Sequence, residues 1–180
     1  MSYHPLMLMV FCMNLLAAAD HQTRFYTFSL GGAHCGYYRE ERSAERLICH
    51  ARFKMDDQVI DSYFEYRLVA GNVTAFRLDP EEIFTDTPAN HIPTGGVLLL
   101  VPQVVKETTI TVVKEGDLTK HWQVTLRRDG NHVVEHKGET KGREFWLKDG
   151  VIVRMSWGGD AVSELKSSKA EALAGLVGID

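Results

Sequence analysis

Apolar and polar residues alternate along most of the chain between Arg24 and Trp157, which is the pattern of half-buried antiparallel β-strands. The alternation is cleanest from Leu47 to Met55, and turn signals rich in glycine or aspartate separate this run from its neighbours. A sheet with many strands curls, because each strand is twisted relative to the next. We therefore predict a mainly β domain, a curved antiparallel meander of about nine or ten strands that forms a half-barrel or open barrel.

The turns also predict how the first four strands pair. Gly31-Gly32 is typical of a two-residue hairpin turn, a charged loop is centred near Arg42, and Asp56-Asp57 marks a third turn. These turns place apolar residues on one face throughout, whereas a register error of one residue would reverse the faces. The predicted rows across the sheet are Phe28, Cys35, Cys49 and Phe64 in one, and Tyr26, Tyr37, Leu47 and Tyr66 in the next.

The predicted register makes Cys35 and Cys49 direct cross-strand neighbours, with Cβ atoms about 4.5–5.5 Å apart. In an oxidising compartment two cysteines at this spacing favour a disulfide. The alternative is two buried free thiols that act as small apolar side chains.

Aromatic residues gather on the face that the curvature makes concave, and Val59 to Val69 is expected to pair with Val73 to Leu78 so that this face continues. Curled sheets of this kind often enclose a cavity for an apolar ligand. The alternative is that the same side chains form only a hydrophobic core. The candidate ligand-binding residues are Tyr26, Phe28, Tyr37, Phe64, Tyr66 and Phe76.

The opposite face carries a row with two histidines, His34 and His50, and Glu65 lies diagonal to His50. Two histidines and a carboxylate could share a metal ion or relay a proton. The alternative is a solvated polar face, because the chain has eight histidines and no HExxH spacing. We predict no metal and no cofactor.

The segment from Asp79 to Gly96 breaks the strand rhythm with three prolines and a Gly-Gly pair. It is either a functional lid or rim that includes His91, or a surface crossover between two parts of the sheet. The following apolar run, Val97 to Val101, is stopped by Pro102 and is expected to be an edge strand or a corner.

The last strands are apolar on both faces, so a further element must cover one of them. Residues 160–177 are rich in Ala, Leu, Lys and Glu and have an apolar stripe, which predicts a C-terminal helix that ends at Gly178. The alternative is a frayed tail. The predicted faces are Phe145, Leu147 and Ile152 on one side, and Trp146, Val151, Val153, Met155 and Trp157 on the other.

The first 19 residues are almost wholly apolar from Pro5 to Ala19 and end in three alanines before Asp20. This length suits a secretory signal peptide, although no Lys or Arg precedes the apolar run. The alternative is a short amphipathic helix packed on the sheet. We expect residues 1–19 to be a signal peptide, residues 20–180 to be one β-rich domain, and the protein to be periplasmic or secreted.

Composition excludes few function classes. A hydrophobic content of 44% and a charged content of 24% are ordinary for a globular domain. The net charge of −4 and the scattered basic residues provide no basic surface, so we expect no nucleic-acid partner.

The segment from Tyr26 to Tyr38, with its Gly-Gly turn and the following Gly36-Tyr37, resembles the opening hairpin of bacterial exported β half-barrel families of unknown function. Those families are similar to lipoprotein-carrier-like β folds. The resemblance implies an exported domain that handles a lipid or another apolar ligand. It covers about a dozen residues and carries over no site residue.

Three functions follow from these patterns. The first is a non-enzymatic exported protein that binds a lipid or other apolar small molecule, with a cavity under the curved sheet. The second is a small hydrolase or isomerase that uses His34, His50 or His91, for which no GxSxG or HExxH motif is present. The third is an accessory or structural module of the cell envelope, with an envelope protein as partner and an exposed apolar patch instead of a cavity.

Overall fold

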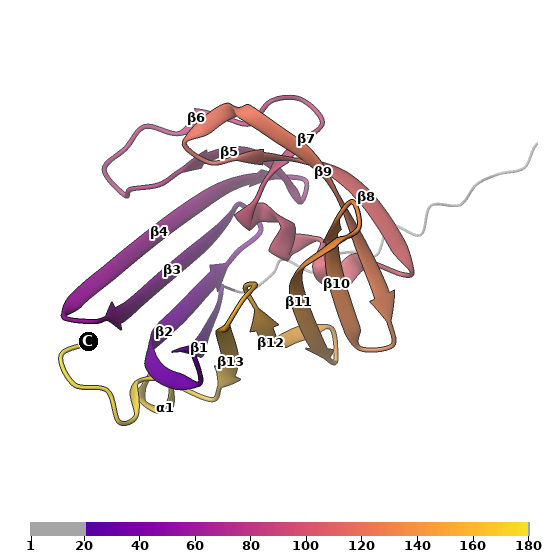
Figure 1. The fold of residues 1–180 in the computed structure, drawn as a ribbon. Helices are drawn as coiled ribbons and strands as arrows, with labels where there is room; N and C mark the ends of the chain where they lie inside the picture. Colours follow the sequence, from indigo (N-terminus) through magenta and orange to yellow (C-terminus); the bar gives the residue numbers. More distant parts are fainter. Residues whose placement is uncertain (1–20, 180) are drawn as a thin grey trace, which may run out of the picture.

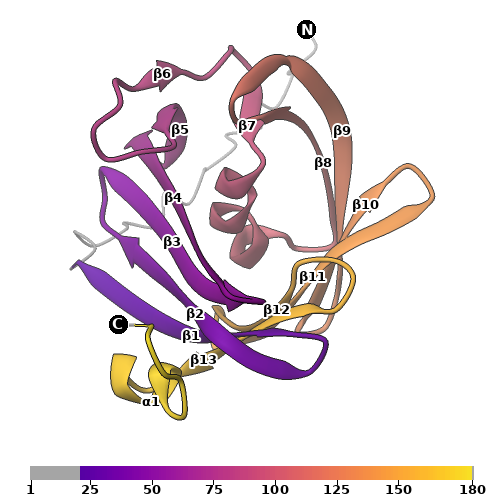
Figure 2. The same ribbon diagram turned by 60° about the vertical axis from the view of Figure 1, so that its left-hand side comes forward.

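The computed structural model describes residues 21–179, which form one strongly curved β-sheet (Figures 1 and 2). Two antiparallel meanders make up most of this sheet. The first consists of β1 (Gln22–Leu30), β2 (Ala33–Arg42), β3 (Arg46–Met55), β4 (Gln58–Val69) and β5 (Asn72–Arg77). The second consists of β8 (Glu107–Lys114), β9 (Asp117–Asp129), β10 (His132–Lys137), β11 (Thr140–Lys148) and β12 (Val151–Ser156).

Three further strands bring the sheet to 13, in the order β6-β5-β4-β3-β2-β1-β13-β12-β11-β10-β9-β8-β7. Strand β13 (Ala161–Lys166) lies between β1 and β12 and joins the meanders, while β6 (Thr85–Asp86) and β7 (His91–Pro93) are the free edges. The predicted class, a mainly β, curved and open sheet, is confirmed. The strand number is higher than predicted, because β6, β7 and β13 lie in segments whose patterns predicted irregular or helical structure.

The first hairpin contains a bulge at Cys35 that the predicted register lacks. Beyond the bulge Tyr26 lies opposite Tyr38, so its predicted pairing with Tyr37 is wrong. A shift of one residue exchanges the two faces of a strand. Tyr38 is therefore buried in the main core, whereas Tyr37 packs on the outer face of the sheet.

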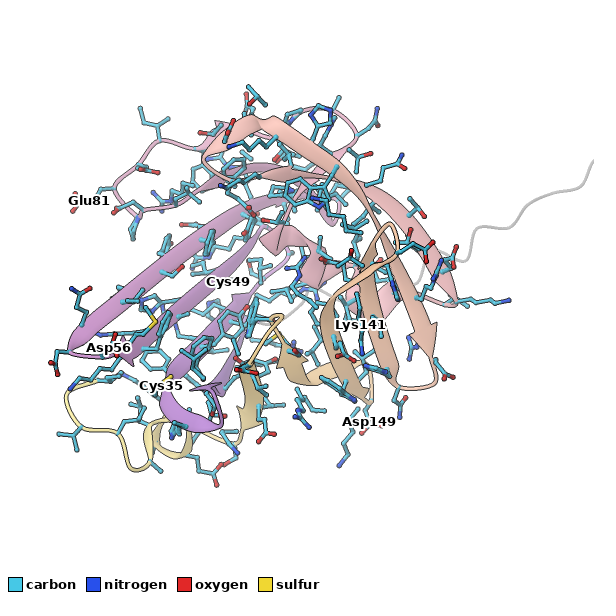
Figure 3. All side chains as sticks on the ribbon, in the orientation of Figure 1. Cys35, Cys49, Asp56, Glu81, Lys141 and Asp149 are labelled. Atoms are coloured by element: carbon cyan, nitrogen blue, oxygen red, sulfur yellow. The ribbon has the colours of Figure 1, made fainter. Side chains whose placement is uncertain are left out.

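The predicted contact between Cys35 and Cys49 is also wrong. The β2–β3 connection is centred after Ala44 instead of near Arg42, which places Glu40 opposite Cys49. Both thiols are free and lie apart (Figure 3), so the structure has no Cys35–Cys49 disulfide. Cys49 is buried in the main core, and Cys35 is half-buried.

The next registers are as predicted. Strands β3 and β4 pair with Cys49 opposite Phe64 and Leu47 opposite Tyr66. Strand β5 places Phe76 opposite Tyr66, with a bulge that restores the faces after a tight turn. The β3–β4 ladder has no bulge, so alternation alone located its register, whereas the β4–β5 register depends on the bulge after Arg67.

The second meander pairs its strands in chain order, with bulges that interrupt the regular register. Strands β8 and β9 pair with Thr108 opposite Leu126, and β11 leads into β12 through Asp149-Gly150. A bulge after Trp146 turns Met155 and Trp157 toward the main core, so their predicted place on the other face is wrong.

The predicted helix over residues 160–177 is wrong in its first half, where the chain forms β13. Paired on both sides, β13 provides partners for backbone groups of β1 and β12 that would otherwise have none. This gain exceeds the modest helix preference of Ala, Leu, Lys and Glu. The remaining helix, α1 (Lys169–Leu173), is short and covers Tyr37 on the outer face together with Ile179.

Two 3₁₀-helices fill part of the concave side of the sheet, as Figure 2 shows: η1 (Gly95–Leu99) and η2 (Val101–Gln103). Val97 and Val101 are fully buried in the main core against both meanders. The predicted edge strand or corner is therefore wrong. Pro102 lies in the first turn of η2, where its missing N–H costs little.

The predicted signal segment, residues 1–19, lies outside the described residues. In the described part of the chain, no helix has both the length and the apolar character needed to cross a membrane.

Strands β2 and β3 approach closely at Gly36. A Cβ atom at this position would lie 2.3 Å from the carbonyl oxygen of Arg52 and 2.4 Å from Cβ of Phe53. Gly36→Ala should therefore lower the free energy of unfolding by about 1–3 kcal/mol, the usual cost of overpacking. Urea denaturation measures this change.

The matched control is Gly142→Ala, on β11, where the nearest atom to the added Cβ is a flexible carboxylate oxygen of Glu135 at 3.2 Å. Gly142→Ala should lower the free energy of unfolding by less than Gly36→Ala does. Equal stability losses for the two variants would contradict the close β2–β3 approach.

The two thiols should differ in reactivity. We expect iodoacetamide to modify Cys35 before Cys49 in the native protein, because burial raises the pKa of the Cys49 thiol and shields it. Non-reducing peptide mapping by mass spectrometry measures both sites, and denaturation should make Cys49 reactive. A peptide cross-linked through Cys35 and Cys49 would contradict the structure.

Candidate functional site

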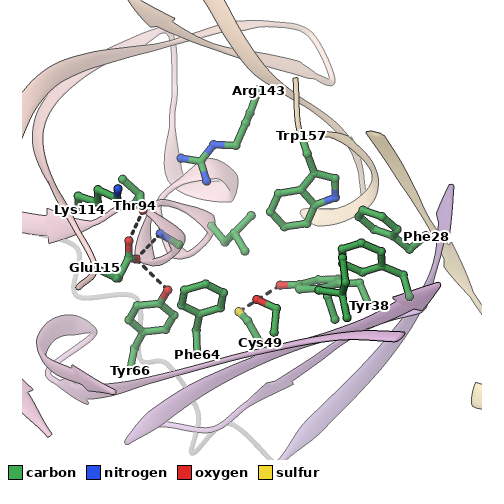
Figure 4. A pocket seen from close by; sticks show the side chains of 16 residues that line it. Phe28, Tyr38, Cys49, Phe64, Tyr66, Thr94, Lys114, Glu115, Arg143 and Trp157 are labelled. Atoms are coloured by element: carbon green, nitrogen blue, oxygen red, sulfur yellow. Dashed lines mark hydrogen bonds between the residues drawn. The ribbon is translucent and has the colours of Figure 1, made fainter. Parts of the chain in front are cut away.

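The concave side of the sheet holds a cavity of about 560 Å³ between the first meander, η1 and the second meander (Figure 4). This volume lies in the range of small-molecule sites, roughly 300–1,000 Å³. Most of its wall is apolar or aromatic. The principal apolar side chains are Phe28, Phe53, Ile60, Phe64, Leu98 and Trp157.

The alternation of β3 and β4 creates this space. Ala51 and Ser62 are cross-strand partners whose side chains both face the cavity. Both are small, so they leave a hollow between the larger aromatic side chains along the same strands. At one end Phe28 stacks on Phe53 with ring centroids 4.6 Å apart, which fixes the aromatic wall there.

A buried carboxylate marks the other end. Glu115, only 9% exposed, accepts a hydrogen bond from the Tyr66 hydroxyl at 3.0 Å and one from the Gly95 N–H at 2.8 Å, both at Oε1. The Thr94 hydroxyl donates to Oε2. Three donors thus replace the water that the carboxylate loses on burial.

The Tyr66 hydroxyl packs directly against the backbone of Gly95. A Cβ atom at Gly95 would lie 2.0 Å from the Tyr66 hydroxyl oxygen, so only glycine leaves room for that hydroxyl. Burial, followed by the adjacent Glu115 charge, raises the pKa of Tyr66 well above its ordinary value. Tyr66 is therefore a neutral hydrogen-bond donor at physiological pH.

Two cations lie near the same end. Arg143 of β11 points into the cavity (Figure 4), and its Nε donates to Glu135 Oε2 at 3.0 Å. Lys114, the last residue of β8, is exposed at the rim. The cavity therefore has a long apolar wall and a small charged end, the usual composition of a site that orients an apolar ligand.

The surroundings of the Cys49 thiol in the cavity wall make it unreactive. Cys49 accepts a hydrogen bond from the Tyr38 hydroxyl, with 3.1 Å between the oxygen and Sγ. Burial, reinforced by the charge of Glu40, raises the pKa of the Cys49 thiol. It is therefore protonated at neutral pH and is a poor nucleophile.

The predicted ligand-binding residues fall into three groups. Phe28, Phe64 and Tyr66 line the cavity. Tyr26 and Phe76 are buried in the surrounding core and do not line it. Tyr37 faces outward under α1, which follows from the bulge in the first hairpin.

The predicted row of histidines is not formed. His34 lies opposite Ser29 and contacts the Gly36 carbonyl oxygen at 3.0 Å, whereas His50 lies opposite Arg39 and contacts Asp61. The cause is the displaced β2–β3 connection, because the pairing of His34 with Ser29 is as predicted. The two histidines are therefore not cross-strand partners.

Two further residues with predicted roles have local partners. Burial opposes ionisation of Glu65, but hydrogen bonds from Tyr63 and Arg77 hold the pKa of Glu65 below its ordinary value. His91, predicted to belong to a lid or rim, packs against the ring of His121 and does not line the cavity. Within residues 21–179, no group of three or more His, Cys, Asp or Glu is arranged to hold a metal ion.

The charged end was not predicted from the sequence. The inward position of Arg143 is visible in the sequence pattern, because it lies two residues before Phe145 and four before Leu147 and so shares their inward face. No sequence pattern indicates the burial of Glu115. It lies in a turn with ordinary turn residues and becomes buried only because Thr94 and Gly95 of the crossover contact it.

No protein-family model matches this sequence, and no curated protein matches it significantly. A crystal structure of a DUF1089 family protein from Pseudomonas aeruginosa aligns with 81% of this chain and 94% of that chain, at 9% sequence identity and a TM-score of 0.33. A similarity this low supports no inference, so the site is interpreted from its own geometry.

The hydrogen bond from Tyr66 to Glu115 should contribute measurably to stability. Tyr66→Phe leaves a buried carboxylate with one donor fewer, and hydrogen bonds to charged groups are worth about 1.5–3 kcal/mol. We expect urea denaturation to show a loss of free energy of unfolding in this range.

Tyr63→Phe is the matched control, because Tyr63 donates to Glu65 at 2.6 Å while Arg77 remains as a second partner. Tyr63→Phe should lower the free energy of unfolding clearly less than Tyr66→Phe does. A Tyr66→Phe variant as stable as the wild type would show that Glu115 does not depend on this donor.

Proposed function

We propose that this protein binds a lipid or another apolar small molecule in the cavity and does not convert it chemically. The observation that supports this proposal is the cavity of about 560 Å³ with its predominantly apolar and aromatic wall. An apolar cavity of this size favours ligands that would otherwise expose hydrophobic surface to water.

The composition of the wall supports binding over catalysis. Among the described residues, no histidine lines the cavity, and the thiol of Cys49 is buried and protonated. Glu115 already accepts three hydrogen bonds. A hydrolase or isomerase that uses His34 or His50 would need a cleft at those residues, and neither contributes to this wall.

The predicted signal segment complements this function. A protein that carries an apolar molecule through the periplasm or the extracellular medium needs a site that removes apolar surface of the ligand from water, and the apolar wall of the cavity is suited to this. An envelope protein that delivers or receives the ligand is the partner this proposal implies. A purely structural envelope module would have no need of the cavity.

Filling the cavity should weaken binding of an apolar ligand. Ala51 faces the hollow, so Ala51→Trp places an indole where the ligand would lie. We expect the affinity for the neutral fluorophore N-phenyl-1-naphthylamine to fall at least about tenfold, or 1.4 kcal/mol. Fluorescence titration measures the affinity.

Ala44→Trp is the control, because Ala44 is exposed in the β2–β3 connection and does not line the cavity. This variant should bind the fluorophore as the wild type does, and circular dichroism should confirm that both variants fold. The proposal fails if the wild type binds no apolar probe, or if the two variants bind equally well.

A further inference from the structure

We infer that the ligand is an amphiphile with a carboxylate headgroup, and that Arg143 holds this carboxylate at the charged end of the cavity. The inference rests on the proposed function, because it names the chemistry of the molecule that the same cavity would bind. It makes Arg143 the residue that determines ligand specificity.

The guanidinium of Arg143 is set up to bind an anion. Glu135 engages one edge through Nε and Nη2 and so fixes the orientation of the group. The side chain is only 14% exposed. The remaining nitrogen, Nη1, donates no hydrogen bond to any described residue, and the guanidinium points into the cavity (Figure 4). A half-buried guanidinium that keeps free donors on the cavity side matches the planar geometry of a carboxylate.

The neighbouring charges favour an anion that carries a single charge. Lys114 adds a positive charge at the rim and forms no ion pair with the described residues. Glu115 is turned toward Tyr66, Thr94 and Gly95, so its oxygens are already engaged. The two cations are offset by two carboxylates, Glu115 in the wall and Glu135 behind Arg143, so a bound dianion would leave more uncompensated negative charge at this end than a monoanion would.

The rest of the cavity suits an aliphatic or aromatic tail. Figure 4 shows the stretch from Phe64 to Phe28 continuing away from Glu115, with Trp157 facing it. Trp157 is held there by its indole N–H, which donates to Ser163 Oγ at 2.9 Å. A ligand with its carboxylate at Arg143 would therefore extend its tail along the aromatic wall toward Phe28.

The test compares three probes with the same tail: dodecanoate, dodecanol and dodecyl phosphate, each below its critical micelle concentration. Their affinities follow from displacement of N-phenyl-1-naphthylamine at pH 8. The wild type should bind dodecanoate best. In Arg143→Gln the affinity for dodecanoate should fall at least about tenfold, since a charged hydrogen bond is lost, while that for dodecanol stays unchanged.

Two variants separate recognition from folding. Arg143→Gln combined with Glu135→Gln removes the unpaired carboxylate that the single change leaves, and it should show the same selective loss. Arg127→Gln is the matched control, because Arg127 also donates through Nε to a glutamate, Glu107, at 2.9 Å but lies outside the cavity wall. It should bind all three probes as the wild type does.

The outcomes distinguish this inference from the proposed function. Equal losses for dodecanoate and dodecanol would assign Arg143 a structural role and overturn the inference, while the proposed function would stand. Tightest binding of dodecyl phosphate would overturn the assignment of a carboxylate. If the wild type binds none of the probes, both the proposed function and the inference fail.

Discussion

The pairing of β13 with both β1 and β12 is the constraint on which the rest of the molecule depends. Without it the two meanders would be separate sheets with no backbone pairing between β1 and β12, joined along the chain by the crossover that carries η1 and η2. The cavity needs both, because Phe28 comes from the first meander and Arg143 from the second. The strand that unites them, β13, pairs with β1, which is far away in the sequence, so the site is complete only after long-range contacts form, which are slow to form in β proteins.

The same curvature explains why a cavity exists. A sheet of 13 strands encloses more space on its concave side than its own side chains fill. The buried 3₁₀-helices occupy part of that space, with Val97 and Val101 packed against both meanders. The remainder lies over Ala51 and Ser62, where the cross-strand pair is too small to fill it. The site is thus the unfilled part of the core, lined by the same kinds of residue.

The sequence pattern predicted the class, most strands and several registers, and its errors have identifiable causes. Alternation and turn residues are local, so they located the β3–β4 pairing correctly. The bulge at Cys35 is not encoded in alternation, and it exchanged Tyr37 and Tyr38 between the faces. Residues 161–166 have helical composition, yet two neighbouring strands lacking partners make them a strand. Burial of Glu115 likewise depends on a distant segment and could not be predicted.

The sheet is open, because no ladder joins the edge strands β6 and β7 in the described part of the chain. Side-chain hydrogen bonds around Glu115 span this seam instead, linking Tyr66 of β4 to the turn after β8. Separating the edges there would break these hydrogen bonds and part of the packing around η1 but no backbone pairing, which opening a closed barrel would also break. The hydrogen bonds at Glu115 that connect the two edges also border the cavity. An incoming solute that competes with Glu115 for these hydroxyl and amide donors would therefore weaken the contact between the edges beside its own binding site.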